Sequence, residues 1–149
     1  MNRQEFESLR DLPNKTIEGD IVFTQPRDTP ILFVAAKIPI ISTGCIKSYL
    51  DIRYNAEIDR CCFNVTIEGT GQVCRLEHNA NNHGKAGRDH KHSLQTEECP
   101  MRNLPHAQDF AGLQDKTPKE IFKIFCKAAS INHQGSVHEP WKVSGRKKL

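Results

Sequence analysis

Apolar and polar side chains alternate along much of the first half of the chain. In residues 46–54, one side of an extended strand would carry Ile46, Ser48, Leu50, Ile52 and Tyr54. Successive side chains of a strand point to opposite faces, so this period of two is typical of a half-buried strand. Similar alternation, or a short run of β-forming residues, predicts further strands at residues 21–23, 31–38, 61–68, 72–77 and 89–96.

The connections between these predicted strands are short. Gly69, Thr70 and Gly71 separate two of them, and glycines at such positions predict a tight hairpin. Residues 55–59 predict a second turn, and the polar residues 79–87 predict a sharply turning loop rich in asparagine and glycine. Consecutive strands with short connections pair antiparallel, so we expect a mainly antiparallel, meandering β-sheet.

The clearest helical pattern lies near the C-terminus. Thr117 and Glu120 form a capping box, and Pro118 stands at the first helical position. We expect this helix to end at Asn132 or Gly135. Its apolar stripe, at helical spacing, would consist of Ile121, Ile124, Phe125 and Ala128.

Together these elements predict an α+β fold. The mainly antiparallel meandering sheet would be covered on one face by the C-terminal helix, as a two-layer sandwich. A chain of 149 residues has the usual length of one domain, so we expect a single domain over residues 1–149. A short helix is predicted for residues 3–10, and the basic tail, residues 142–149, is expected to be flexible.

Composition places the chain among globular proteins. Hydrophobic residues make up 37% and charged residues 26% of the chain. The longest apolar run, residues 31–41, is broken by Lys37 and Pro39. This run is shorter than the ~18 residues that an apolar helix needs to span a bilayer. The polar, mixed-charge N-terminus lacks the pattern of a signal or transit peptide. We therefore expect a cytoplasmic protein with no membrane partner.

Six cysteines are present, and none forms a C-x-x-C pair. In a chain without an export signal, cysteines in apolar surroundings are expected to be buried free thiols. In the adjacent pair Cys61 and Cys62, only one side chain can face the core if the pair lies on a strand.

Polar chemistry is concentrated in residues 78–92. The net charge is only +3, but His83, His90 and His92 fall within ten residues. On a strand, His90 and His92 share a face, and a pair of imidazoles can act as general base and general acid near neutral pH. Such a pair beside basic residues predicts metal-independent cleavage of RNA, in which the 2′-hydroxyl is the nucleophile.

Eight polar residues of this segment receive a predicted role. The predicted catalytic residues are His90, His92, Lys85 and Asp89. Lys85 and Arg88 would hold a phosphate, and Asp89 or Asn79 would orient an imidazole. The expected substrate contacts are Arg88, Lys91, Asn79 and His83. No cofactor is expected.

Three alternatives stay open. His90 and His92, with His83 as a third ligand, would form the open metal site of a metal-dependent hydrolase. The same basic loop would also suit a non-catalytic module of a mobile element that contacts nucleic acid or an acidic protein. The histidines would otherwise be ordinary polar surface.

The segment also resembles a known family. Residues 73–79 read Val-Cys-Arg-Leu-Glu-His-Asn and residues 84–92 read Gly-Lys-Ala-Gly-Arg-Asp-His-Lys-His. This pattern, within about residues 60–130, is similar to the TumE-family toxins of prokaryotic toxin–antitoxin systems. The resemblance implies a cytoplasmic toxin with a cognate antitoxin protein and RNA as partners. The matching signature residues would be Asn79, Gly84, Lys85, Gly87, Asp89, His90 and His92.

Overall fold

A computed structural model describes residues 14–26, 31–42, 47–68, 71–79, 88–92 and 108–141. The predicted helix at residues 3–10, most of the loop at residues 79–87 and the tail at residues 142–149 lie outside these ranges. The hairpin tip at residues 69 and 70 and the second half of the predicted strand at residues 89–96 also lie outside them.

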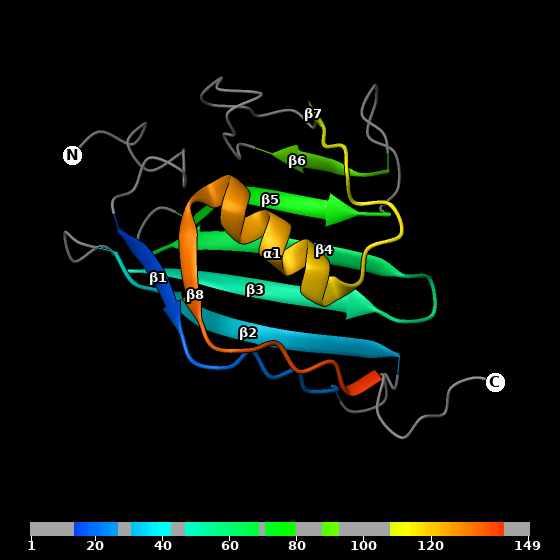
Figure 1. Cartoon of the computed structure of the whole chain (residues 1–149), viewed down its shortest axis with the longest axis horizontal. Helices are drawn as coiled ribbons and strands as arrows, with labels where there is room; N and C mark the ends of the chain where they lie inside the picture. Colours follow the sequence, from blue (N-terminus) through cyan, green and yellow to red (C-terminus); the bar gives the residue numbers. More distant parts are fainter. Residues whose placement is uncertain are drawn as a thin grey trace.

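A six-stranded antiparallel sheet forms the larger layer of the structure (Figure 1). Its strands follow one another in chain order, so the predicted antiparallel meander is confirmed. They are β2 (Leu32–Ile40), β3 (Ser48–Asn55), β4 (Arg60–Ile67), β5 (Gly71–His78), β6 (His90–His92) and β7 (Gln108–Asp109).

Strand β2 continues through Pro39, where the sequence predicted an end. Pro39 pairs with Tyr49 of β3, and the register shifts between Ala35 and Ile38. Proline lacks an N–H group, but β2 lies at the edge of the sheet, where a proline can be accommodated. The predicted strand at residues 21–23 is wrong, because Ile21 forms only an isolated bridge, with Val137.

A second, parallel pair of strands was not predicted. It joins β1 (Lys15–Glu18) to β8 (Ile131–Gln134), from opposite ends of the chain. Strand β8 occupies residues that the sequence assigned to the end of the helix. The helix ends earlier because Ser130 adopts a left-handed conformation, with φ of 59°, and its N–H caps the last turn.

The helix α1 (Pro118–Ala129) begins with the predicted capping box. The Thr117 hydroxyl accepts a hydrogen bond from the Glu120 backbone N–H, and the Glu120 carboxylate accepts one from the Thr117 N–H. The rings of Phe122 and Phe125 stack on Phe63 of β4, with centroids 6.3 and 5.4 Å away. The buried side chains of α1 are Pro118, Ile121, Phe122, Phe125, Cys126 and Ala129, whereas Ile124 and Ala128 are only partly buried.

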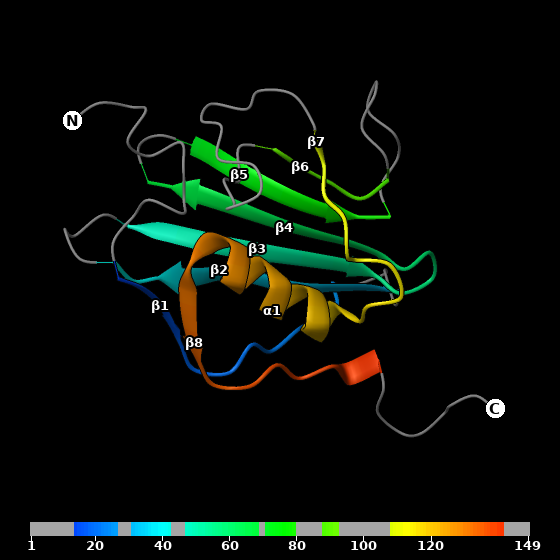
Figure 2. The same cartoon turned by 45° about the horizontal axis from the view of Figure 1, so that its top comes forward.

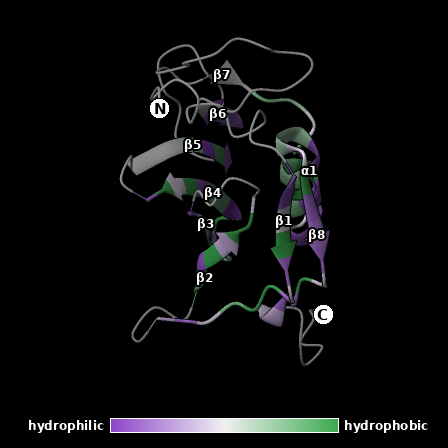
Figure 3. Cartoon of the chain, turned by 90° about the vertical axis from the view of Figure 1, so that its left-hand side faces the viewer, coloured by the Kyte–Doolittle hydropathy of each residue, from purple (hydrophilic) through white to green (hydrophobic). Residues whose placement is uncertain are grey.

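The helix and the β1–β8 pair lie on one side of the large sheet (Figures 2 and 3). The hydrophobic core fills the space between these layers, and alternation along β3 and β4 decides which side chains enter it. The core side receives Leu50, Ile52, Tyr54, Cys61, Phe63, Val65 and Ile67. In the described part of the chain, no helix is long and apolar enough to cross a membrane.

Candidate functional site at the end of strand β5

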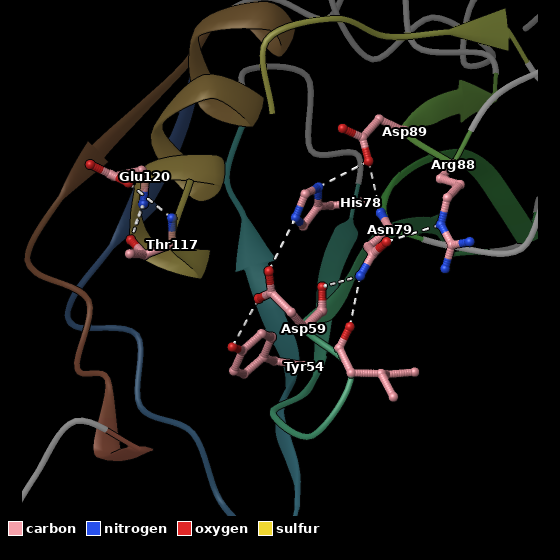
Figure 4. Close-up of polar contacts among 9 residues, drawn as sticks. Tyr54, Asp59, His78, Asn79, Arg88, Asp89, Thr117 and Glu120 are labelled. Carbon is pink, nitrogen blue, oxygen red and sulfur yellow. Dashed lines mark hydrogen bonds and ion pairs between the residues drawn. The ribbon is translucent and has the colours of Figure 1, made fainter. Parts of the chain in front are cut away.

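One imidazole lies between two carboxylates at the end of β5 (Figure 4). His78 Nδ1 is 2.9 Å from Asp89 Oδ1, and His78 Nε2 is 3.6 Å from Asp59 Oδ2. An ionised carboxylate can only accept a hydrogen bond, so Nδ1 carries the hydrogen of the shorter contact. Asp89 therefore fixes the orientation of the ring, and the second nitrogen faces Asp59.

Two residues in left-handed conformations bring these groups together. Asp59 ends the turn between β3 and β4 with φ of 55°, and Asn79 follows β5 with φ of 60°. Asparagine and aspartate adopt this conformation more readily than other non-glycine residues. The turn is also held by Asn55, whose side-chain oxygen accepts hydrogen bonds from the backbone N–H groups of Glu57 and Ile58.

Asn79 connects three parts of the chain. Its Nδ2 donates to the carbonyl oxygens of Ile58 at 2.7 Å and Asp59 at 3.3 Å. Its backbone N–H donates to Asp89 Oδ1 at 2.8 Å, and its Oδ1 accepts from Arg88 Nε at 3.0 Å. The end of β5, the β3–β4 turn and the residues before β6 are therefore fixed to one another.

Exposure decides which of these groups a substrate can reach. The side chain of Asp59 is 55% exposed, compared with 24% for Asp89 and 7% for His78. Tyr54 donates its hydroxyl hydrogen to Asp59 Oδ1 at 3.0 Å. Burial, together with the nearby Asp59 charge, holds the pKa of Tyr54 above its usual range, so the phenol remains a donor at neutral pH. Asp59 is thus the accessible end of a row of connected polar groups.

The structure shows one of the expected contacts, but with a different histidine. Asp89, expected to orient an imidazole, does so, but the imidazole belongs to His78 rather than to His90 or His92. His90 is fully buried, with Nε2 3.8 Å from Glu77 Oε1 on the opposite face of the sheet. Nothing in this arrangement exposes the His90 ring to a substrate.

Lys91 also differs from its predicted role as a substrate contact. It pairs with Leu76 on the core side of the sheet and is only 1% exposed. Its ammonium nitrogen lies 5.9 Å from the centre of the Phe110 ring, a distance at which a cation is attracted to the aromatic face. Strand β6 lies between β5 and β7, and successive side chains of a strand point to opposite faces. Lys91 therefore points to the core side of the sheet, as its partner Leu76 does.

Several predicted residues lie outside the part of the chain that the structure describes. These are His83 and Lys85, together with the signature glycines at positions 84 and 87. Of His92 only the backbone is described, and it pairs with Arg75 of β5. Of the predicted metal ligands His83, His90 and His92, the structure describes the side chain of His90 alone. Within the described residues, no three His, Cys, Asp or Glu side chains are grouped so that they could hold a metal ion.

Sequence patterns pointed only weakly to His78 and not at all to Asp59. The signal for His78 was its place in the alternation of β5, where it follows Cys74 and Leu76 on the core-facing side. A titratable residue at a core-facing position must find partners, because burying an unpaired polar group is costly. Asp59 left no comparable signal, because a turn aspartate is ordinary until the fold places a histidine beside it.

Comparison with known proteins gave no match: no protein family, no curated protein and no solved structure is significantly similar to this chain. The resemblance to the TumE family therefore remains a prediction. The function has to be argued from the geometry around His78.

Proposed function

We propose that this protein is a metal-independent RNA-cleaving enzyme and acts as a toxin. One observation carries the proposal: the His78 imidazole is held by Asp89 on one nitrogen and faces the exposed Asp59 carboxylate with the other. A carboxylate that neighbouring polar groups hold in place, and that solvent can reach, can accept a proton from a hydroxyl group. In this proposal Asp59 and His78 take the place predicted for His90 and His92.

The proposed reaction is transfer of a phosphodiester within the RNA chain. Asp59 accepts the proton of a ribose 2′-hydroxyl, and the 2′-oxygen forms a bond to the adjacent phosphorus. The bond from phosphorus to the 5′-oxygen of the next nucleotide breaks, and that oxygen takes a proton from water. The products are a 2′,3′-cyclic phosphate and a free 5′-hydroxyl. The Tyr54 hydroxyl donates to one oxygen of Asp59 and positions the carboxylate, and His78 Nε2 faces the other oxygen.

Arg88 is suited to hold the phosphate. Its Nε donates to Asn79 Oδ1, which fixes the direction of the side chain, while the residue itself is exposed. The terminal nitrogens of such a guanidinium can donate to two phosphate oxygens and stabilise charge that develops in the transition state. The proposal thus keeps for Arg88 the phosphate-holding role predicted from the sequence.

The test compares Asp59→Asn with Glu57→Gln. Both changes remove one carboxylate from the same exposed turn, but only Asp59 contacts His78. Because general-base catalysis contributes about 10²–10⁴-fold, we expect Asp59→Asn to lower kcat/KM for a labelled RNA by about 10²-fold or more. Glu57→Gln should cleave like the wild type, with matching circular dichroism spectra for all three proteins.

Other outcomes separate the remaining functions. Equal cleavage by Asp59→Asn and wild type would refute the proposed site. Cleavage that is lost in EDTA and restored by Zn²⁺ or Mn²⁺ would indicate the metal-dependent hydrolase instead. In cells, the toxin role predicts growth arrest with new RNA fragments on induction of wild type, and growth with Asp59→Asn. An antitoxin partner stays a prediction from the family resemblance.

A further inference from the structure

The face of the sheet opposite α1 carries a groove of about 730 Å³. It crosses strands β2 to β5. In Figure 3, α1 and the β1–β8 pair lie on the other side of this sheet. Three arginines from three neighbouring strands line the groove: Arg53 of β3, Arg60 of β4 and Arg75 of β5. Asp51 and Glu77 are the carboxylates in the same lining.

Register explains why these charges meet. Arg53 pairs with Cys62, and Cys62 pairs with Glu77, so these three residues form one row across the strands. Side chains directly opposite one another share a face. Their sequence neighbours Tyr54, Cys61 and His78 enter the core, which leaves this row on the face opposite α1.

The carboxylates do not neutralise all of this positive charge. Glu77, which is 2% exposed, is 3.1 Å from Arg75 and 3.5 Å from Arg60. Burial alone would raise the pKa of Glu77, but the hydrogen bond from Arg75 and the charges of His90, Arg75 and Arg60 hold it below its usual value. Among the described residues, no carboxylate lies within ion-pair distance of Arg53, which is exposed. Arg53 is therefore available to an anionic ligand.

The groove ends at the turn that carries the proposed site. Ile58 and Arg60, the neighbours of Asp59 in the sequence, both line it. Asp59 lies between them in the turn, but its carboxylate contacts Tyr54 and His78 on the core side of the sheet. On the side away from the arginines, the lining is apolar and includes Val34 and Ala36.

We infer that this groove binds the backbone of a single RNA strand. Arginines on β3 and β5 stand two strands apart, roughly 10 Å, so they can meet different phosphates of one strand. The apolar side offers a surface for the bases. The choice of RNA as the ligand rests on the proposed function, whereas the complementarity to a phosphate chain rests on the arginines alone.

The test measures binding of a probe that cannot be cleaved. A fluorescein-labelled single-stranded oligonucleotide with 2′-O-methyl groups lacks the 2′-hydroxyl nucleophile, so binding is separated from catalysis. Fluorescence anisotropy would compare wild type with Arg53→Gln and with Lys123→Gln, an equal loss of charge on the exposed side of α1. Arg53 is exposed and has no carboxylate partner among the described residues, so Arg53→Gln should fold normally.

We expect Arg53→Gln to weaken binding about tenfold near physiological salt, because it removes one charged contact to phosphate. The slope of log K against log salt should become less steep by about 0.7, as for one lost contact to a single strand. Lys123→Gln should match the wild type in affinity.

Three results would overturn the inference. They are wild-type affinity in Arg53→Gln, no binding of the oligonucleotide by wild type, and displacement of the oligonucleotide by poly-glutamate as efficiently as by unlabelled strand. The last would indicate a groove for an acidic peptide. Because the probe resists cleavage, each result is independent of the Asp59 experiment: the strand can bind without turnover, and Asp59 can act on RNA bound elsewhere.

Discussion

Asn79 offers a direct test of the way the candidate site is assembled. Its backbone has a φ of 60°, and its side chain connects the β3–β4 turn to Arg88. Replacement by glycine removes the side-chain hydrogen bonds but permits the left-handed backbone. Replacement by alanine removes the same bonds and also introduces a Cβ atom, which the left-handed region disfavours.

The two replacements should therefore differ in size. The bonds from Asn79 Nδ2 to the Ile58 carbonyl and from Arg88 to Asn79 Oδ1 are the two shorter side-chain contacts, at 2.7 and 3.0 Å. A hydrogen bond contributes about 0.5–1.5 kcal/mol, so Asn79→Gly should lower the free energy of unfolding by about 1–3 kcal/mol. Alanine stabilises a protein relative to glycine because it lowers the conformational entropy of the unfolded chain, but the strain of its Cβ in the left-handed region is larger. Asn79→Ala should therefore be about 1 kcal/mol less stable than Asn79→Gly.

Urea unfolding followed by circular dichroism measures this difference. The midpoints of the variants should fall in the order wild type, Asn79→Gly, Asn79→Ala, with similar m-values. An alanine variant as stable as the glycine variant would refute the left-handed backbone at this position. Wild-type stability in both would refute the hydrogen bonds that fix the turn.

Two further predictions concern buried titratable groups. The pKa of Glu77 is lower in the folded protein than its unfolded value near 4.5, so its contribution to stability is present above that value and is lost as the pH falls through the folded pKa. Arg75→Gln should therefore make the urea midpoint fall less steeply between about pH 6 and about pH 3.5. An unchanged slope would contradict the ion pair between Arg75 and Glu77. Burial raises the pKa of the Cys62 thiol to about 11 and that of the Cys126 thiol to about 12. Iodoacetamide at neutral pH should therefore label both cysteines slowly in the native protein and rapidly in urea, as read by peptide mass spectrometry; equal rates at Cys126 would show that its burial is wrong.

Local signals in the sequence predicted the strands and the start of the helix well. The strict alternation at residues 46–54 and 61–68 gave both the strands and their buried faces, because a period of two leaves only one choice of face. The capping box at Thr117 placed the beginning of α1 at the observed residue. The end of α1 was missed because Ser130 takes a left-handed conformation that glycine or asparagine more often adopts.

The candidate site was predicted only in part. Asp89 and Asn79 were recognised, and Asp89 was expected to orient an imidazole, but His90 and Lys91 were assigned to a substrate that cannot reach them. Burial of β6 depends on pairing with β5 and β7, which are distant in the sequence from one another. A hydrophobic pattern cannot report such burial when the buried residues are themselves charged or polar.

The sequence by itself determined what depends on neighbouring residues: the strand period, the turn at residues 55–59, the helix cap and the α+β class. Tertiary structure alone decided what depends on contacts between distant segments. It joined β1 to β8, brought Asp59 of one turn to His78 of another strand, and gathered three arginines on one face. Local conformation follows from sterics and hydrogen bonds within a few residues, whereas a site is assembled by packing, and packing follows from the whole chain.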